Sequence, residues 1–162
     1  MASNRYYRKS TSITVSNFYE QYQLGKYRFD PPYQRDMNVW DIEQKSFLLD
    51  TIFKNLWNVL YLTGKQRIPP IFLEQKIDSD TGITNYDVID GKQRLSTIIG
   101  FINNEIPLPK EFGNDIYGNN IINGLSFNEI KKIAKEDDEI KTLVSDFWAY
   151  SISVEYIENP DY

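Results

Sequence analysis

The chain has 162 residues, 41% hydrophobic and 15% aromatic, which is enough to bury a core as one globular domain. It carries 18 Lys and Arg against 23 Asp and Glu, and the formal net charge of -5 argues against tight non-specific binding to the DNA backbone. There is no Cys and no His, which excludes disulfides, zinc–cysteine sites, histidine triads and histidine–metal nuclease centres. No apolar run approaches a transmembrane span, so we expect a cytoplasmic protein without a membrane partner.

The N-terminal part predicts one short helix and one short strand. Residues 1–12 are polar, and we expect a loose lead-in there. The segment Val15–Leu24 predicts a helix, with Ser16 as its N-cap and Gly25 as its C-terminal stop. Polar and aromatic residues alternate in Lys26–Phe29, which predicts a short strand that ends before the following prolines.

A longer helix is expected to begin at Asp41. Gln44 completes a variant of the capping box, which satisfies backbone N–H groups at a helix start. The apolar residues that follow keep helical spacing and predict a core-facing stripe: Ile42, Leu49, Ile52, Phe53 and Leu56. The sequence leaves open whether this helix continues through Leu56–Leu62 or a second helix begins there.

The middle of the chain predicts a β-hairpin that leads into a helix. Ile71–Glu74 and Tyr86–Ile89 are rich in β-branched and aromatic residues, and a turn-forming stretch separates them. Beyond the second strand, apolar residues again recur at helical spacing and predict a helix that runs to about residue 103 or 104: Leu95, Ile98, Ile99 and Ile102.

The C-terminal part predicts two further helices and a closing strand. Ser126 and Glu129 form a capping box for a helix over Phe127–Lys135. The four acids of Glu136–Glu139 precede a helical apolar pattern, so we expect them to complement a helix N-terminus rather than to bind a metal. Large apolar residues alternate with small or polar ones in Trp148–Tyr156, which predicts a half-buried strand. The expected fold class is α+β, with a small mixed sheet and packed helices.

The turn between the second hairpin strand and the next helix is the most informative stretch. Gly91 follows Asp90 and lets the backbone take a positive φ or approach a ligand closely. Gln93 and Arg94 then stand at a helix start, where free backbone N–H groups and the helix dipole favour an anion such as phosphate. Taken alone, the same residues also fit an ordinary turn with a surface arginine.

Two stretches together resemble a known family. Pro32-Tyr33-Gln34-Arg35 with Trp40, followed by Val88-Ile89-Asp90-Gly91-Lys92-Gln93-Arg94-Leu95-Ser96-Thr97, is similar to the motifs of the DUF262 domain. That domain forms the N-terminal part of GmrSD-type, modification-dependent restriction proteins and of related phage-defence proteins. The resemblance covers about Ile13 to Tyr156, so we expect one DUF262-like domain over residues 13–162. It implies a ParB/sulfiredoxin-like fold in which this turn handles nucleotide phosphates.

The resemblance implies binding and hydrolysis of a nucleoside triphosphate, coupled to DNA recognition or cleavage. Asp90, Gly91, Gln93 and Arg94 match the family's Asp-Gly-Gln-Gln-Arg motif, in which Lys92 replaces a glutamine. The implied catalytic residues are Asp90, Gln93 and Arg94, and the implied nucleotide-binding residues are Gln34, Arg35, Gly91, Lys92, Ser96 and Thr97. Mg²⁺ is the expected ion, its ligands are not identified, and the base of the nucleotide stays open.

Three functions remain open. An NTP-hydrolysing domain of a restriction or phage-defence protein is favoured, and the alternative is a nucleotide- or DNA-sensing module without turnover. A free-standing nuclease would need metal ligands that Glu74, Asp87 and Asp90 do not convincingly supply. Family members usually continue past the closing strand into a helical region and often an HNH nuclease. We therefore expect that C-terminal region, and any contact with DNA, to belong to a missing domain or a partner chain, and the oligomeric state stays open.

Overall fold

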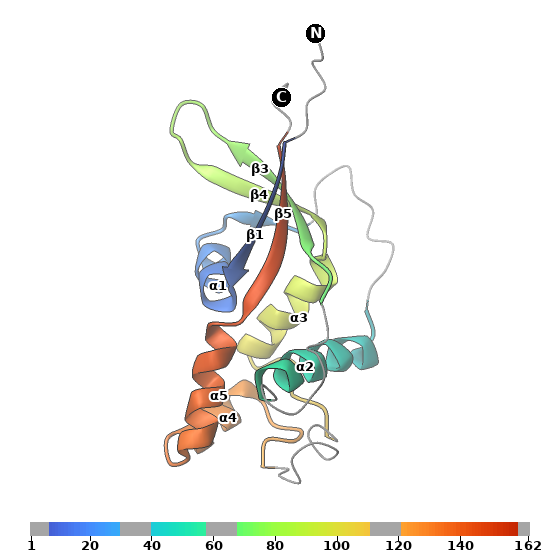
Figure 1. The fold of residues 1–162 in the computed structure, drawn as a ribbon, viewed down its shortest axis with the longest axis vertical. Helices are drawn as coiled ribbons and strands as arrows, with labels where there is room; N and C mark the ends of the chain where they lie inside the picture. Colours follow the sequence, from blue (N-terminus) through green and yellow to red (C-terminus); the bar gives the residue numbers. More distant parts are fainter. Residues whose placement is uncertain (1–6, 30–39, 58–67, 111–120, 159–162) are drawn as a thin grey trace. The chain divides into compact units, whose positions relative to one another are not determined.

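The computed structural model describes residues 7–29, 40–57, 68–110 and 121–158 (Figure 1). The strands are β1 (Tyr7–Thr14), β2 (Tyr27–Arg28), β3 (Ile71–Ile77), β4 (Thr84–Asp90) and β5 (Ser151–Glu158). The helices are α1 (Val15–Gln23), α2 (Ile42–Trp57), α3 (Lys92–Ile102), α4 (Phe127–Ala134) and α5 (Asp138–Trp148). This mixture of helices with one sheet confirms the α+β class.

The chain forms two units. The sheet unit comprises Met1–Asn38, Ile68–Lys92 and Ser151–Tyr162, and the helical unit comprises Val39–Arg67 and Gln93–Tyr150. No helix in the described ranges is long and apolar enough to cross a membrane.

The sheet is mixed, with the strand order β1-β5-β3-β4-β2. β1 pairs antiparallel with β5, and β3 pairs antiparallel with β4, so β3 and β4 form the predicted hairpin. β3 runs parallel to β5, and β2 runs parallel to β4. A small mixed sheet of this kind is consistent with the expected ParB/sulfiredoxin-like fold.

The two faces of the sheet differ because side chains alternate along each strand. One face is apolar, and its buried residues are Ile71, Leu73, Val88, Ile152 and Val154. α1 packs on this face through Phe18, whose ring centre lies 4.9 Å from that of Tyr27 on β2. The opposite face, called the polar face below, carries the charged residues Glu74, Lys76, Asp87 and Glu155 together with Phe72 and Ile157.

The helical unit is built around four phenylalanines, one from each helix: Phe53, Phe101, Phe127 and Phe147. Each is at most 1% exposed. The ring centres of neighbouring pairs are 5.0 to 5.4 Å apart, in tilted, stacked and edge-to-face arrangements. This cluster joins all four helices into one core.

Three helix caps that the sequence predicts are confirmed. Asp41 and Gln44 exchange hydrogen bonds between side chain and backbone N–H at 2.9 and 3.0 Å. Ser126 and Glu129 form the full capping box of α4. The acidic run complements a helix N-terminus as expected, since the Asp137 side chain accepts from the Ile140 N–H and caps α5.

Two expectations about the N-terminus were wrong. Residues 7–12 are not a loose lead-in, because they belong to β1 and pair along their whole length with β5. The side chains of residues 9–12 are exposed, which suits an edge strand, and the partner strand is too distant in sequence for a local pattern to reveal it. The N-cap of α1 is Thr14 rather than Ser16, and its Oγ1 accepts from the Asn17 N–H at 3.0 Å.

Two other expectations needed correction. Ile42 is 61% exposed and does not join the buried stripe of α2, because it stands in the first turn of the helix. Trp148 ends α5, and the closing strand begins only at Ser151, since the alternating pattern overlaps a helix end. α2 runs as far as Trp57, and the segment 58–62 lies outside the described residues.

Candidate functional site

A single residue separates β4 from α3 at the predicted strand–helix turn. β4 ends at Asp90 and α3 begins at Lys92, so Gly91 makes the whole connection. Its φ of 103° lies in the region that side chains with a Cβ rarely adopt. The strand–turn–helix prediction is therefore confirmed, and the backbone geometry explains why glycine stands at this position.

A β-bulge decides on which face of the sheet Asp90 lies. Val88 pairs with Leu73, whereas Asp90 pairs with Phe72, so Ile89 is the extra residue at the register shift. In a regular strand Asp90 would share the apolar face of Val88, because alternate residues lie on one face. Pairing with Phe72 moves Asp90 to the polar face, where the residue is exposed.

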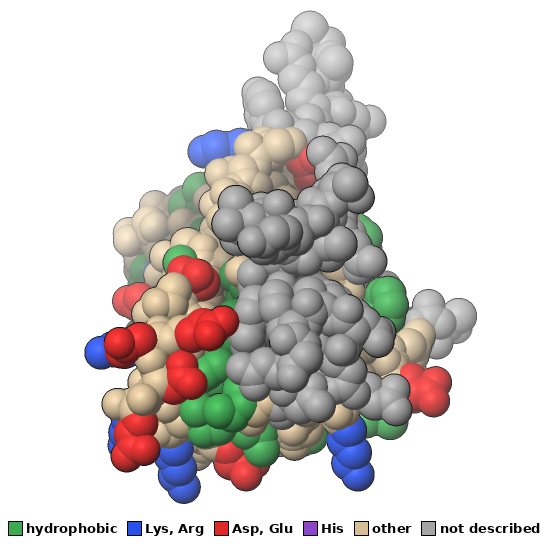
Figure 2. Space-filling view, turned by 60° about the horizontal axis from the view of Figure 1, so that its bottom comes forward, with side chains coloured by type: hydrophobic (Ala, Val, Ile, Leu, Met, Phe, Trp, Pro, Cys, Tyr) green, Lys and Arg blue, Asp and Glu red, His purple; other side chains and the backbone are tan. Residues whose placement is uncertain are grey.

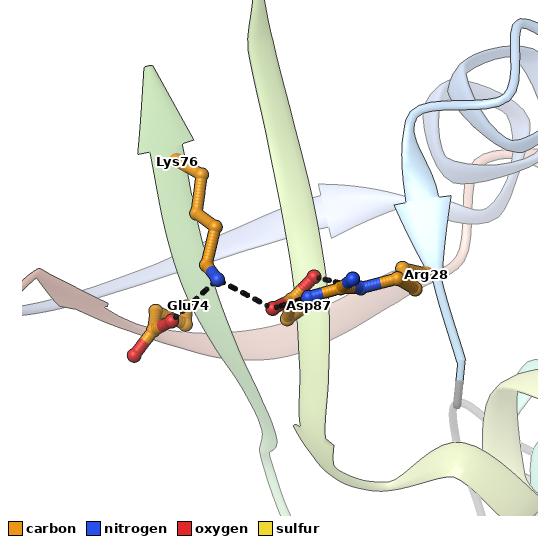
Figure 3. Close-up of polar contacts among 4 residues, drawn as sticks. All are labelled: Arg28, Glu74, Lys76 and Asp87. Carbon is orange, nitrogen blue, oxygen red and sulfur yellow. Dashed lines mark hydrogen bonds and ion pairs between the residues drawn. The ribbon is translucent and has the colours of Figure 1, made fainter. Parts of the chain in front are cut away.

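Next to this turn, the polar face carries an ion cluster centred on Asp87 (Figure 3). Arg28 donates from Nε and Nη2 to the two carboxylate oxygens of Asp87 at 2.8 and 2.7 Å. Lys76 Nζ lies 3.0 Å from Asp87 Oδ2 and 3.5 Å from Glu74 Oε1. The Asp87 side chain is 5% exposed, against 48% for Arg28 and 43% for Lys76. We call these four residues the Asp87 cluster.

The two cations keep Asp87 ionised although it is buried. Burial raises the pKa of Asp87, but hydrogen bonds and charge from Arg28 and Lys76 outweigh it, and the pKa lies below its ordinary value. The hydrogen bond to Asp87 in turn raises the pKa of Lys76. Because cations already engage its carboxylate, Asp87 is poorly suited to bind a metal ion, and the described ranges contain no group of three or more acidic side chains placed to do so.

On the helix side of the turn, Gln93 contacts the other family motif. Its Oε1 accepts a hydrogen bond of 3.2 Å from the backbone N–H of Trp40, within the helical unit. Thr97 is fully buried, and its hydroxyl donates a hydrogen bond of 2.7 Å to the carbonyl of Gln93 one helical turn earlier. This bond gives Thr97 a structural role within α3. Lys92, Arg94 and Ser96 are half-buried. Gln34 and Arg35 lie outside the described residues, so their roles stay predictions.

The sequence interpretation missed two features, the Asp87 cluster and the bulge. A signal for the first was present, because Asp87 interrupts the apolar and aromatic run of Tyr86–Ile89. Its partner Arg28 comes from a two-residue strand, which no local pattern pairs with β4. The bulge depends on the pairing of β3 with β4, which the sequence of β4 alone does not specify.

These features define an α+β domain with a glycine turn between a sheet strand and a helix start. A family model described as the N-terminal domain of the GmrSD restriction endonuclease matches residues 15–159. The chain belongs to this family, which confirms the DUF262 resemblance and makes it a module of the restriction and phage-defence type. No curated protein and no solved structure matches the chain.

We expect Gly91→Ala to lower the free energy of unfolding by about 1–3 kcal/mol, because alanine is strained at a φ of 103°. Urea unfolding followed by circular dichroism measures the effect. Gly82→Ala is the matched control, since Gly82 has a φ of 73° with nothing within 4 Å and lies in the β3–β4 turn. Both variants should lose stability, because both glycines have a positive φ. A Gly91→Ala variant as stable as wild type would contradict the positive φ at this turn.

Proposed function

We propose that this domain binds a nucleoside triphosphate at the turn between β4 and α3 and hydrolyses it as part of a restriction or phage-defence protein. The observation that carries the proposal is the backbone of the turn. A bulge brings Asp90 to the polar face, and Gly91 with its positive φ leads directly into a helix N-terminus. Such a start presents backbone N–H groups to an anion, and family membership supports phosphate as that anion.

Each side chain of the motif has a role in this proposal. Phosphoryl transfer to water needs mainly positioning and charge neutralisation. Lys92 and Arg94 supply positive charge, with the planar guanidinium suited to phosphate oxygens. Gln93 orients the attacking water, and Ser96 donates to a phosphate oxygen. Gln34 and Arg35 complete the set.

Asp90 fits the proposed Mg²⁺. Its carboxylate is exposed on the polar face of the sheet, and Mg²⁺ is often bound by one or two carboxylates together with substrate phosphates. When bound, the ion would neutralise charge on the phosphate oxygens. Asp90 would supply the protein ligand and hold it at the edge of the phosphate-binding turn.

The topology of the described strands is compatible with assigning Gln34 and Arg35 to the same site, although both residues lie outside the described part of the chain. β2 runs parallel to β4 with Arg28 beside Asp87, so the chain leaves β2 at the sheet end where β4 delivers Asp90. Gln34 and Arg35 follow six and seven residues after Arg28. Six residues reach at most about 20 Å, which is compatible with a shared site.

The alternative is a nucleotide- or DNA-sensing module without turnover. One observation favours it, because the Oε1 atom of Gln93 already accepts a hydrogen bond from the Trp40 backbone. Acidic side chains gather at the left of the face shown in Figure 2, and such a face repels a phosphate backbone. We therefore assign DNA contact to another domain or a partner chain, and we place the protein in the cytoplasm, where nucleotides and DNA are available to it.

The test is phosphate release from ATP, GTP, CTP and UTP with Mg²⁺. We expect Asp90→Ala and Arg94→Ala to lower turnover by about 10²–10³-fold with unchanged circular dichroism. Asp146→Ala and Lys141→Ala, on the exposed surface of α5, are the controls and should keep wild-type turnover. Nucleotide binding that needs Arg94 but gives no turnover would establish the sensing module. Wild-type protein that binds no nucleotide would disprove NTP hydrolysis and nucleotide sensing alike.

A further inference from the structure

We propose that Phe72 on β3 forms a stacking surface for the base of the nucleotide whose phosphates bind at the turn between β4 and α3. This inference rests on the proposed function of the turn and adds the place where the base lies. The role assigned to Phe72 is a direct contact between its ring and the face of the base.

Phe72 stands beside Asp90 in a row of side chains that crosses the polar face of the sheet. Phe72 pairs with Asp90 on β4 and with Glu155 on β5, and these three strands are neighbours in the sheet. All three residues belong to the sheet unit. Neighbouring strands lie about 4.8 Å apart, so the backbone of Asp90 is about 5 Å from that of Phe72 and about 10 Å from that of Glu155.

The aromatic ring of Phe72 interrupts a charged surface. The next residue, Leu73, is fully buried on the apolar face, and Phe72 lies half-buried on the opposite face because side chains alternate along the strand. Charged residues surround it there, with Asp90 and Glu155 on the flanking strands and Glu74 two residues along β3. The row therefore offers a planar apolar group directly beside the carboxylate that the proposed function assigns to Mg²⁺.

The spacing of this row suits a nucleotide. One ribose joins the base to the first phosphate, so the base of a nucleotide held at Asp90 and Gly91 falls one to two strand spacings away, about 5–10 Å. The polar face extends from the turn in this direction across β3 and β5. On the other side of β4, β2 ends at Arg28 opposite Asp87, so no described strand lies beside Asp90 there. Phe72 is therefore the aromatic side chain within reach of the base along the row.

Charge decides which end of the nucleotide lies over Phe72. Glu155 stands on the far side of Phe72 from the turn, and its Oε2 accepts a hydrogen bond of 2.6 Å from the Ser10 hydroxyl. A carboxylate repels phosphates, whereas a helix N-terminus attracts them. The phosphates are therefore favoured at the turn and the uncharged base at the ring. Every base has a π-face, so stacking on an aromatic side chain accepts all four bases.

The experiment compares nucleotides with inorganic tripolyphosphate, which carries phosphates but no base. Titration calorimetry with Mg²⁺ measures Kd for tripolyphosphate and for the non-hydrolysable β,γ-imido analogues of ATP, GTP, CTP and UTP. We expect the nucleotide Kd to rise about tenfold in Phe72→Leu, which keeps the bulk but loses the π-face, and about 10–100-fold in Phe72→Ala. Phe72→Trp should stay within about threefold of wild type. The Kd for tripolyphosphate should change less than about twofold in every variant.

Ile157→Ala is the matched control. Ile157 is also apolar and half-buried on the polar face, but it pairs with Glu74 and lies outside the row that contains Asp90. It should keep wild-type Kd values for both kinds of ligand. Circular dichroism and urea unfolding establish which variants are folded, and Phe72→Leu decides the outcome if Phe72→Ala does not fold.

The outcomes separate the stacking role from the proposed function. Wild-type protein that binds neither the nucleotide analogues nor tripolyphosphate would disprove both. If wild type binds the analogues, unchanged nucleotide binding by Phe72→Leu would overturn the stacking role alone. An equal loss of tripolyphosphate binding in Phe72→Leu would do the same, because it would show a structural effect on the turn. An equal loss of nucleotide binding in Ile157→Ala would also overturn it.

Discussion

Replacing Phe101 by alanine is expected to lower the free energy of unfolding by about 3–5 kcal/mol. Phe101 is fully buried in α3, and its ring centre lies 5.0 to 5.4 Å from those of Phe53, Phe127 and Phe147. Each aromatic pair contributes about 0.5–1.5 kcal/mol beyond the area it buries. The substitution would remove three such pairs and leave a cavity where α2, α4 and α5 meet α3.

Urea unfolding followed by circular dichroism measures this loss. Phe47→Ala is the control, because Phe47 is 66% exposed on α2 and should change stability by no more than about 0.5 kcal/mol. The comparison holds residue type constant and varies only burial. Similar losses in the two variants would show that the four-ring cluster is not the core of the helical unit.

The second large effect is expected for Asp87→Asn, at about 2–4 kcal/mol near pH 7. The substitution removes the negative charge that accepts two bonds from Arg28 and one contact from Lys76. Hydrogen bonds to charged groups are worth about 1.5–3 kcal/mol, and breaking a buried ion pair costs more than breaking a surface pair. Arg28 and Lys76 are partly exposed, so water can hydrate them once the carboxylate is gone. The expected loss of stability is therefore at the lower end of the range for breaking a buried ion pair.

The difference in the free energy of unfolding between wild type and Asp87→Asn should depend on pH. The pKa of Asp87 is lowered below 3.8 in the folded protein, so the ionised carboxylate stabilises the fold above pH 3.8. That stability is lost as the pH falls through the folded pKa, and the difference between the two proteins should shrink there. Backbone hydrogen bonds also lower the pKa of Asp78 and Glu129, but these groups are the same in both proteins and cancel.

Thermal unfolding of both proteins between pH 2.5 and pH 7 measures this dependence, and a second series across pH 10.5 measures the contribution of Lys76. At the alkaline end, the raised pKa of Lys76 means that its contribution is present below pH 10.5 and is lost as the pH rises through the folded pKa. The Asp87→Asn variant should show a smaller alkaline loss, because Glu74 remains beside Lys76. A stability difference that stays constant from pH 2.5 to pH 7 would contradict the ionised state of Asp87.

The sequence by itself determined most of the helices, their caps and the hairpin. The capping boxes at Asp41 and Ser126 and the strand–glycine–helix turn at Gly91 depend on residues a few positions apart, which a local pattern contains. The family was also readable from two motifs in order, and the family model covers residues 15–159. Local chemistry and motif order are encoded within short segments, so they need no tertiary information.

Only the tertiary structure decided the features that depend on pairing between distant strands. Residues 7–12 became an edge strand because β5, more than 130 residues later, supplies the partner. Pairing with Phe72 places Asp90 on the polar face, and the pairing of β2 with β4 joins Arg28 to Asp87. Which strands meet, and in which register, depends on how the whole sheet buries its apolar face, so no segment contains that information by itself.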